Sequence, residues 1–269
     1  MNFKPPPLRD VIKRFDLRTQ KKLGQHFLLD QNLTKRVARA AGNINTCTVI
    51  EVGPGPGGLT RALLENGAKK VIAIEHDPRC VEAIEELAIN YNGRLKIIEF
   101  NALKLSLFDL CQGPKKIVAN LPYNIATPLL IGWLKHINHF ESLTLMFQKE
   151  VADRLTASPG NKTYGRLSVL AQWLCHTNHE FDVSRTAFTP PPKVDSTLVT
   201  LIPRGLTFTS TDWNNFEKVT AAAFGHRRKM LRTNLKHLDV DFKNLDIDPT
   251  VRAENLSVSQ FCAIARSIE

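Results

Sequence analysis

A glycine-rich stretch has the residue types and spacing of a cofactor loop. In Glu51-Val-Gly-Pro-Gly-Pro-Gly-Gly58, the residues Gly53, Gly55 and Gly58 match the G-x-G-x-x-G pattern with which a strand-to-helix turn approaches a nucleotide. Glu75 follows Gly53 by 22 residues, where an acid can bind the two hydroxyls of a ribose. The pattern therefore predicts a site for a nucleoside-containing cofactor.

Two prolines make this loop a poor cradle for phosphate. Pro54 and Pro56 have no backbone N–H, so two donors that would bind a pyrophosphate are missing. S-Adenosylmethionine has a ribose that suits Glu75, a methionine tail that glycines can approach closely, and no phosphate. We therefore expect S-adenosylmethionine as the cofactor. An NAD-dependent oxidoreductase is a weaker alternative, which a titration with NAD would test.

The second chemical motif is Asn120-Leu121-Pro122-Tyr123, which follows a predicted strand at the sheet edge where ligands of such folds bind. The exocyclic amine of a base is a poor nucleophile because its lone pair is delocalised into the ring. The Asn120 side-chain oxygen and a backbone carbonyl beside Pro122 can accept the two amine hydrogens, while Tyr123 stacks on the ring. Beside a cofactor loop of the right type, this motif predicts methyl transfer to a base.

Short β-branched runs alternate with helical patterns through the first two thirds of the chain. Strands are expected at Thr48–Val52, Lys70–Glu75, Leu95–Phe100, Lys116–Asn120 and Ser142–Phe147. Helices are expected after the caps Asp30 and Asp77, the latter with Pro78 in the preferred first position, and over 59–65. Apolar strands separated by helices predict an α/β fold, a Rossmann-like methyltransferase sheet with helices on both faces.

The last third of the chain has a different pattern. A helix is expected over 164–175, a late strand over Thr197–Ile202, and only helices from Thr211 onward. Ser257 and Gln260 have the spacing of a capping box. We place a boundary near Gly205. Residues 1–205 then form the methyltransferase domain with a basic N-terminal arm, and residues 206–269 a helical RNA-binding domain.

The charge balance favours an acidic partner. The 269 residues include 36 Lys and Arg against 26 Asp and Glu, a formal net charge of +10. Nucleic acid is the simplest partner for such a surplus, because each neutralised phosphate releases counterions. With 43% hydrophobic and 23% charged residues, the composition is that of a globular protein. No stretch approaches the roughly 18 apolar residues of a membrane span, so we expect a soluble protein and no membrane partner.

The cysteines and histidines give no metal or disulfide pattern. The five cysteines are scattered and form no C-x-x-C pair, which fits reduced thiols in the cytoplasm. His136 and His139, like His176 and His179, are three residues apart without an acid partner, so we expect no metal.

Nearly the whole chain closely resembles the bacterial small-subunit ribosomal RNA adenine dimethyltransferase family, of KsgA/RsmA type. The blocks that carry the resemblance are KKLGQHFL at Lys21–Leu28, the Glu51–Gly58 loop, NLPY at Asn120–Tyr123, QKEVADRL at Gln148–Leu155, YGRLSVLAQ at Tyr164–Gln172, AFTPPPKVDS at Ala187–Ser196, AFGHRRK at Ala223–Lys229 and RAENLSVSQ at Arg252–Gln260. Several of these blocks are specific to that family rather than to methyltransferases at large.

The resemblance implies a function and a set of site residues. It implies dimethylation at N6 of two adjacent adenosines in the 3′-terminal hairpin loop of 16S rRNA, on the small ribosomal subunit or its precursor, by a monomer. The implied cofactor residues are Gln25, His26, Leu28, Gly53, Gly55, Glu75, Asn101 and Asn120. The residues Asn120, Leu121, Pro122 and Tyr123 would hold the adenine, and Phe188, before three prolines, would stack on its other face. Charge and resemblance together assign RNA contacts to Lys21, Lys22, Arg227, Arg228 and Lys229.

One residue departs from the family pattern. Asn101 stands where the family usually has Asp, whose carboxylate is expected to accept the amino hydrogens of the cofactor adenine. A neutral acceptor should weaken that hydrogen bond by about 1 kcal/mol.

Two further alternatives stay open. A ribosome-assembly factor, for which binding matters rather than catalysis, would still bind immature subunits after Glu75→Ala. A DNA adenine methyltransferase would share the NLPY chemistry but has no reason to match the C-terminal blocks.

Overall fold

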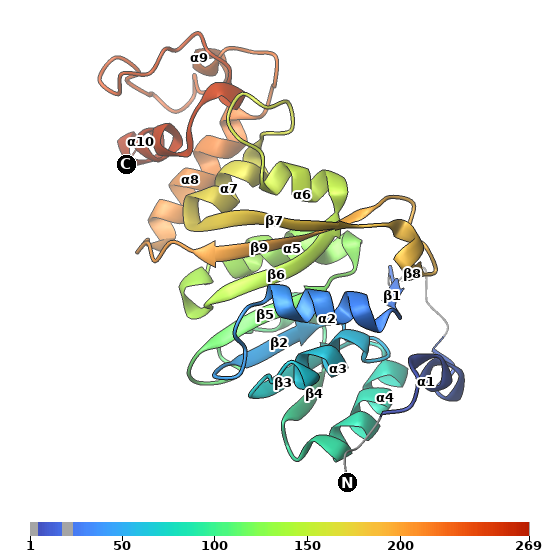
Figure 1. Cartoon of the computed structure of the whole chain (residues 1–269). Coiled ribbons are helices and arrows are strands. Elements are labelled where there is room, and N and C mark those ends of the chain that lie inside the picture. The colour runs from blue at the N-terminus through green and yellow to red at the C-terminus, as the bar shows by residue number, and fades with distance from the viewer. Residues whose placement is uncertain (1–4, 18–23, 269) are drawn as a thin grey trace. The chain divides into compact units, whose positions relative to one another are not determined.

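The computed structural model describes residues 5–17 and 24–268 (Figure 1). The chain forms two compact units. The first unit takes the residues up to Lys149 together with His179–Ile202, and the second takes Glu150–Asn178 with the residues from Pro203 onward. No helix within the described ranges is both long enough and apolar enough to cross a membrane.

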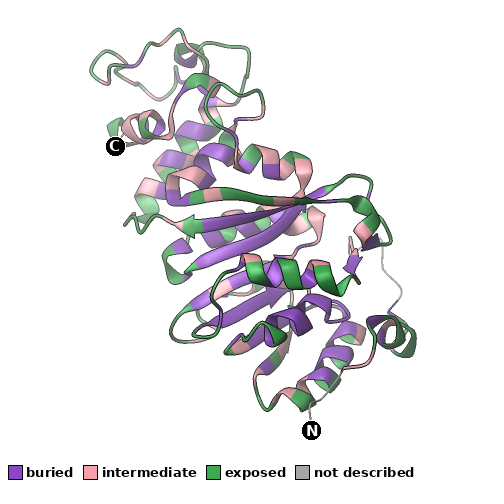
Figure 2. Ribbon diagram, in the orientation of Figure 1, coloured by how far each residue is buried: buried purple, intermediate pink, exposed green. Residues whose placement is uncertain are grey.

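The first unit is built on parallel strands. They are β2 (Thr48–Val52), β3 (Lys70–Glu75), β4 (Leu95–Glu99), β5 (Lys115–Asn120) and β6 (Ser142–Gln148). β2 is buried along its whole length, and β3 and β6 nearly so (Figure 2), which is why these segments are continuous apolar runs in the sequence. All five strands predicted for this part of the chain are confirmed.

One side of the sheet departs from the parallel pattern. The strand order is β4-β3-β2-β5-β6-β9-β7, and β9 (Ser196–Pro203), the predicted late strand, runs antiparallel to β6. The sequence pattern does not predict β7 (Cys175–Val183), because this terminal strand buries only its first and last residues and so has no apolar run. The expected fold class is confirmed as a Rossmann-like α/β fold, with a mixed sheet flanked by helices.

Helices and short turns connect these strands. The helices are α1 (Leu8–Arg14), α2 (Gln31–Ala40), α3 (Gly58–Glu65), α4 (Pro78–Ala88), α5 (Tyr123–Leu134) and α6 (Lys149–Leu155), with 3-10 turns at Ile89–Tyr91, Ala102–Lys104, Ile137–His139 and Arg185–Ala187. Both predicted caps are confirmed. The Asp30 carboxylate accepts the Asn32 N–H at 2.7 Å, and the Asp77 carboxylate accepts the Arg79 N–H at 3.2 Å.

Two short strands join segments that are far apart in the sequence. β1 (Phe27–Leu28) pairs antiparallel with β8 (Phe188–Thr189), so that Leu28 lies opposite Phe188. This pairing fixes the GQHFL segment against the proline-rich loop that follows β8. It thereby positions Gln25 and His26, which have no regular structure of their own.

The second unit contains α6 from Glu150 onward, α7 (Arg166–Leu174), α8 (Ser210–Ala223), α9 (Leu231–Asn234), α10 (Val258–Ser267) and a 3-10 turn at Ala253–Asn255. The predicted capping box is confirmed, since Ser257 Oγ accepts the Gln260 N–H and Gln260 Oε1 accepts the Ser257 N–H. α7 packs against α8 and α10, and the Trp173 ring stacks on Phe216 with centroids 4.0 Å apart. This aromatic contact explains why Glu150–Asn178 lies in the second unit, although the expected boundary near Gly205 assigns it to the first.

The contact between α3 and β1 leaves no room for a side chain at Gly58. A Cβ there would lie 2.6 Å from the Leu28 carbonyl oxygen and 3.2 Å from Leu8 Cδ1. Gly58→Ala should therefore lower the free energy of unfolding by about 1–3 kcal/mol, measured by urea denaturation. Gly132→Ala in α5 is the matched control, because nothing lies within 4 Å of its added Cβ and alanine favours a helix by up to about 1 kcal/mol. Equal stability of the two variants would contradict this packing.

Candidate functional site

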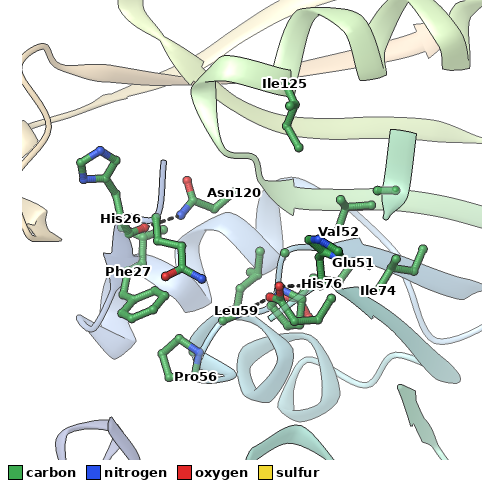
Figure 3. Close-up of a pocket in the computed structure, with 18 of the residues that line it drawn as sticks. His26, Phe27, Glu51, Val52, Pro56, Leu59, Ile74, His76, Asn120 and Ile125 are labelled. Carbon is green, nitrogen blue, oxygen red and sulfur yellow. Dashed lines mark hydrogen bonds between the residues drawn. The ribbon is translucent and has the colours of Figure 1, made fainter. Parts of the chain in front are cut away.

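A cavity of about 330 Å³ lies at the carboxyl ends of β2, β3 and β5. In Figure 3, His26, Phe27 and Asn120 lie on one side of it and Glu51, Ile74 and His76 on the other. All eight predicted cofactor residues line this one cavity: Gln25, His26, Leu28, Gly53, Gly55, Glu75, Asn101 and Asn120. The structure thus brings together residues from five separate segments of the chain.

The glycine loop is fixed to the end of β3 by the Glu75 carboxylate. Glu75 Oε2 accepts the Gly55 N–H at 3.2 Å, and Oε1 accepts the N–H groups of His76 at 2.7 Å and Asp77 at 3.0 Å. Burial raises the pKa of Glu75, which is 8% exposed, and these three N–H groups partly oppose that increase. Oε2 accepts only one of these three N–H groups and keeps a second lone pair, so the carboxylate can still accept a ribose hydroxyl.

Gly55 shows why this loop needs glycine. Its φ is +53°, and a Cβ there would lie 2.9 Å from the Phe27 ring. Both the left-handed backbone and the close approach of Phe27 therefore exclude larger residues at this position.

Glu51 is a second acidic side chain in the cavity. The sequence places it in the glycine-rich loop but predicts no role for it. Its side chain is 1% exposed, and Oε2 has no hydrogen-bond partner within the described residues. Burial raises the pKa of Glu51 to about 8, Thr60 partly opposes the increase, and the Glu75 carboxylate adds to it. The described lining residues include these two acids but no Lys or Arg, so the cavity favours a positively charged ligand.

Asn101 lies at the cavity wall after β4. Its Oδ1 accepts the Leu103 N–H at 3.0 Å, which begins the 3-10 turn Ala102–Lys104. The exposed apolar side chains Phe100 and Leu103 line the cavity beside it. Sequence patterns do not identify these two residues, because exposure of an apolar side chain at a cavity is decided by tertiary structure.

The NLPY motif lies between this cavity and a shallow hollow lined by Gly24, His26, Tyr123, Asn124 and Gln148. The Asn120 Nδ2 group donates to the His26 carbonyl oxygen at 3.1 Å. Because this bond uses the amide donor, Oδ1 is the atom that can accept a hydrogen from a substrate amine. His26 and Asn124 line both the cavity and the hollow, so a base in the hollow would lie next to a ligand in the cavity.

Tyr123 is held in place by side-chain contacts. Its hydroxyl is hydrogen-bonded to the Ser196 hydroxyl, and its ring stacks on His26 with centroids 5.7 Å apart. His26 Nδ1 in turn lies 2.7 Å from the Pro190 carbonyl oxygen. Burial raises the pKa of Tyr123, so the phenol is neutral at physiological pH. Pro122 precedes α5, and Leu121 is buried in the core.

Phe188, which is predicted to stack on the base, is a buried residue. Its side chain is 2% exposed, packs in the core cluster with Leu28, Val37 and Leu198, and lines neither the cavity nor the hollow. Pairing of its backbone with Leu28, which lines the cavity, brings it near the site, while its side chain is buried in the core cluster. Stacking of Phe188 on the base therefore stays a prediction.

The predicted RNA contacts divide into two groups. Lys21 and Lys22 lie outside the described residues. Arg227, Arg228 and Lys229 are exposed in the second unit, between α8 and α9. Arg227 also donates to the carbonyl oxygens of Lys162 and Tyr164, at 2.8 and 3.0 Å, so it supports its own unit as well as presenting charge.

Several residues near the site are not identified by the sequence patterns. Asn124 directly follows the NLPY motif, and Gln148 begins the QKEVADRL block. Their nearness to these motifs in the sequence could have indicated that they belong to the site. His76 and Ile125 lie one or two positions from predicted site residues in the sequence, but tertiary structure decides that they line the cavity.

Comparison with known proteins identifies the family of the chain. A family model described as "Ribosomal RNA adenine dimethylase" matches residues 16–269. The "Ribosomal RNA small subunit methyltransferase A" of Rhodospirillum rubrum is 55% identical over 268 residues, which cover 98% of this chain and 93% of the relative. The protein of the same name from Paramagnetospirillum magneticum is 54% identical over 267 residues, covering 98% and 95%.

Solved structures show the same fold. A dimethyladenosine transferase from Plasmodium falciparum has a TM-score of 0.78 and 28% identity, over 89% of this chain and 96% of that chain. The 23S rRNA methyltransferase ErmE has a TM-score of 0.71 at 23% identity, over 90% and 99%, and supports the fold alone. The match of the family model over nearly all of the chain, with relatives more than half identical, shows that this chain belongs to the ribosomal RNA adenine dimethylase family of S-adenosylmethionine-dependent methyltransferases.

Proposed function

We propose that this chain transfers methyl groups from S-adenosylmethionine to N6 of two adjacent adenosines in the 3′-terminal hairpin loop of 16S rRNA, and methylates each twice during biogenesis of the small ribosomal subunit. This proposal rests on one observation, that the cavity and the hollow are adjacent and share lining residues. A cavity with two carboxylates adjoins a hollow with Tyr123, and Asn120 lies at the boundary. The family and the names of its relatives support the substrate class.

The residues of the cavity fit the proposed cofactor. Glu75 can accept ribose hydroxyls, the Gly53–Gly55 turn gives close access to the methionine part, and Asn101 and Phe100 lie where a purine would bind. The absence of Lys and Arg among the described lining residues suits a cationic ligand better than the phosphates of NAD. When bound, this cofactor supplies a methyl group that its sulfonium makes reactive.

The chain's own residues would orient the adenine and polarise its amine. Asn120 Oδ1 and the backbone carbonyl beside Pro122 accept the two amine hydrogens, which directs the nitrogen lone pair toward the cavity. The rings of Tyr123 and His26 form an aromatic surface on which the base can stack. The adenine must leave its own stack to reach the hollow, so binding includes base flipping.

Binding to the subunit is assigned to the basic surface. Arg228 and Lys229 are exposed, and the formal charge of +10 favours a partner rich in phosphates. We propose 16S rRNA in the small subunit or its precursor as this partner, with residues 206–269 contributing an RNA-binding surface. We further propose that the protein acts as a monomer in the cytoplasm, where its five free cysteines would stay reduced.

The direct test is transfer of labelled methyl groups from S-adenosylmethionine to 30S subunits that lack the modification. We expect up to four methyl groups per subunit, all at N6 of two neighbouring adenosines. Incorporation into duplex DNA but not into subunits would indicate a DNA adenine methyltransferase. Binding to immature subunits without any methyl transfer would support an assembly factor alone.

Removal of the amine acceptor should affect turnover more than cofactor binding. Asn120→Ala is expected to lower kcat by about 100-fold, the size of effect seen when one preorganised polar group is removed from an active site, with a much smaller change in the Kd of S-adenosylmethionine. Asn120→Asp is the matched control, because it keeps an acceptor oxygen but loses the donor to His26. Unchanged turnover in Asn120→Ala would refute the role of Asn120.

Asn101→Asp should tighten cofactor binding and leave activity intact. A carboxylate can keep the hydrogen bond from the Leu103 N–H and accept more strongly from the cofactor adenine. We expect a gain of about 1 kcal/mol, or roughly fivefold in Kd by calorimetry. Weaker binding would show that Asn101 does not accept from the adenine.

A further inference from the structure

Glu51 is the group in the cavity that the proposed mechanism leaves without a task. It lies at the end of β2, its side chain is 1% exposed, and it lines the cavity. Its Oε2 atom is buried and has no hydrogen-bond partner within the described residues. A buried carboxylate oxygen without a partner is costly, so Glu51 needs either a proton of its own or a ligand that satisfies it.

The surroundings of Glu51 add negative charge. Glu75, from the neighbouring strand β3, lines the same cavity, and Thr60 in α3 is the polar neighbour on the helix side. The other titratable groups that line the cavity in the described structure are His26 and His76. Two buried carboxylates that share a site resist ionising together, and this effect adds to the burial that raises the pKa of Glu51 to about 8.

We propose that Glu51 holds a proton before the cofactor binds and releases it to solvent when a positively charged cofactor enters the cavity. This inference rests on the proposed function, because it takes S-adenosylmethionine as the ligand. The O–H bond of the carboxyl group breaks, the proton passes to solvent, and the remaining carboxylate balances the sulfonium or the ammonium of the cofactor. No bond to the cofactor forms in this step.

Proton release gives the cavity a means of distinguishing ligands by charge. Methyl transfer converts the sulfonium into a neutral thioether, so the product S-adenosylhomocysteine carries one positive charge less. Below the raised pKa of Glu51, the ionised fraction increases tenfold for each pH unit. The affinity for the cofactor should therefore increase by up to about tenfold per pH unit from pH 6 toward pH 8, and level off above it.

Calorimetry of the full-length protein at pH 7, in buffers of different ionisation enthalpy, counts the protons released on binding. Three ligands separate the charges. S-Adenosylmethionine carries a sulfonium and an ammonium, S-adenosylhomocysteine only the ammonium, and 5′-methylthioadenosine neither. Glu51→Gln is the uncharged isostere, and its proton count measures every contribution other than that of Glu51.

We expect close to one proton released with S-adenosylmethionine by the native protein, and none above background by Glu51→Gln. Release with S-adenosylhomocysteine as well assigns the ammonium as the partner of Glu51, whereas release with S-adenosylmethionine alone assigns the sulfonium. Equal counts in the native protein and the variant, or equal release with methylthioadenosine, overturn the inference. Absence of binding by all three ligands overturns the proposed function and this inference with it.

A second measurement requires no ligand. Because folded Glu51 keeps its proton at pH values where the unfolded chain has lost it, the native protein should become less stable between about pH 5 and pH 8. Glu51→Gln lacks this loss, so at pH 8 its Tm should exceed the native Tm by several degrees, with little difference at pH 5. The same pH dependence of Tm in both proteins would contradict a proton on Glu51.

Discussion

Three backbone N–H groups converge on the buried carboxylate of Glu75, and the geometry of the cavity depends on this interaction. It joins the Gly53–Gly55 turn after β2 to the end of β3 and to the start of α4. Parallel strands bring these segments to one edge of the sheet, but only specific hydrogen bonds hold the loop at a defined distance. A buried polar side chain at the end of a strand thus fixes the loop that borders the cavity.

A second set of contacts joins the segment before β1, the NLPY motif and the loop after β8. The Asn120 amide donates to the His26 carbonyl oxygen, the His26 imidazole stacks on Tyr123, and its Nδ1 contacts the Pro190 carbonyl oxygen. These residues are separated by up to 164 positions in the chain. Because each contact limits the motion of the next, the boundary between the cavity and the hollow is defined before any ligand binds.

The protein separates its charges by location. The exterior carries the net positive charge that suits rRNA, whereas the described wall of the cavity carries two carboxylates and no Lys or Arg. An anionic partner and a cationic cofactor are thus attracted to different places on the same chain. Glu51 accordingly has no Lys or Arg beside it in the described lining of the cavity.

The five parallel strands, the late strand β9, the helices α2, α3 and α4 and the chemical motifs were determined by the sequence alone. β-branched runs, the caps Asp30 and Asp77 and the glycine spacing are local features, and local propensity and hydrophobic pattern express them directly. The eight predicted cofactor residues were named through the resemblance to a known family, and of these Gly53, Gly55, Glu75 and Asn120 also lie in motifs that the residue types indicate by themselves. The parallel order of strands brings Gly53, Glu75 and Asn120 to one cavity, whereas the pairing of β1 with β8 brings Gln25, His26 and Leu28 there.

Tertiary structure alone decided the features that depend on contacts between distant segments. The polar strand β7 forms only because a sheet end accepts exposed side chains, and Glu150–Asn178 joins the second unit because Trp173 stacks on Phe216. Phe188 is buried in the core cluster, and no local sequence pattern indicates this burial. The raised pKa of Glu51 likewise arises from burial beside Glu75, since desolvation is set by the surrounding packing and not by the residue itself.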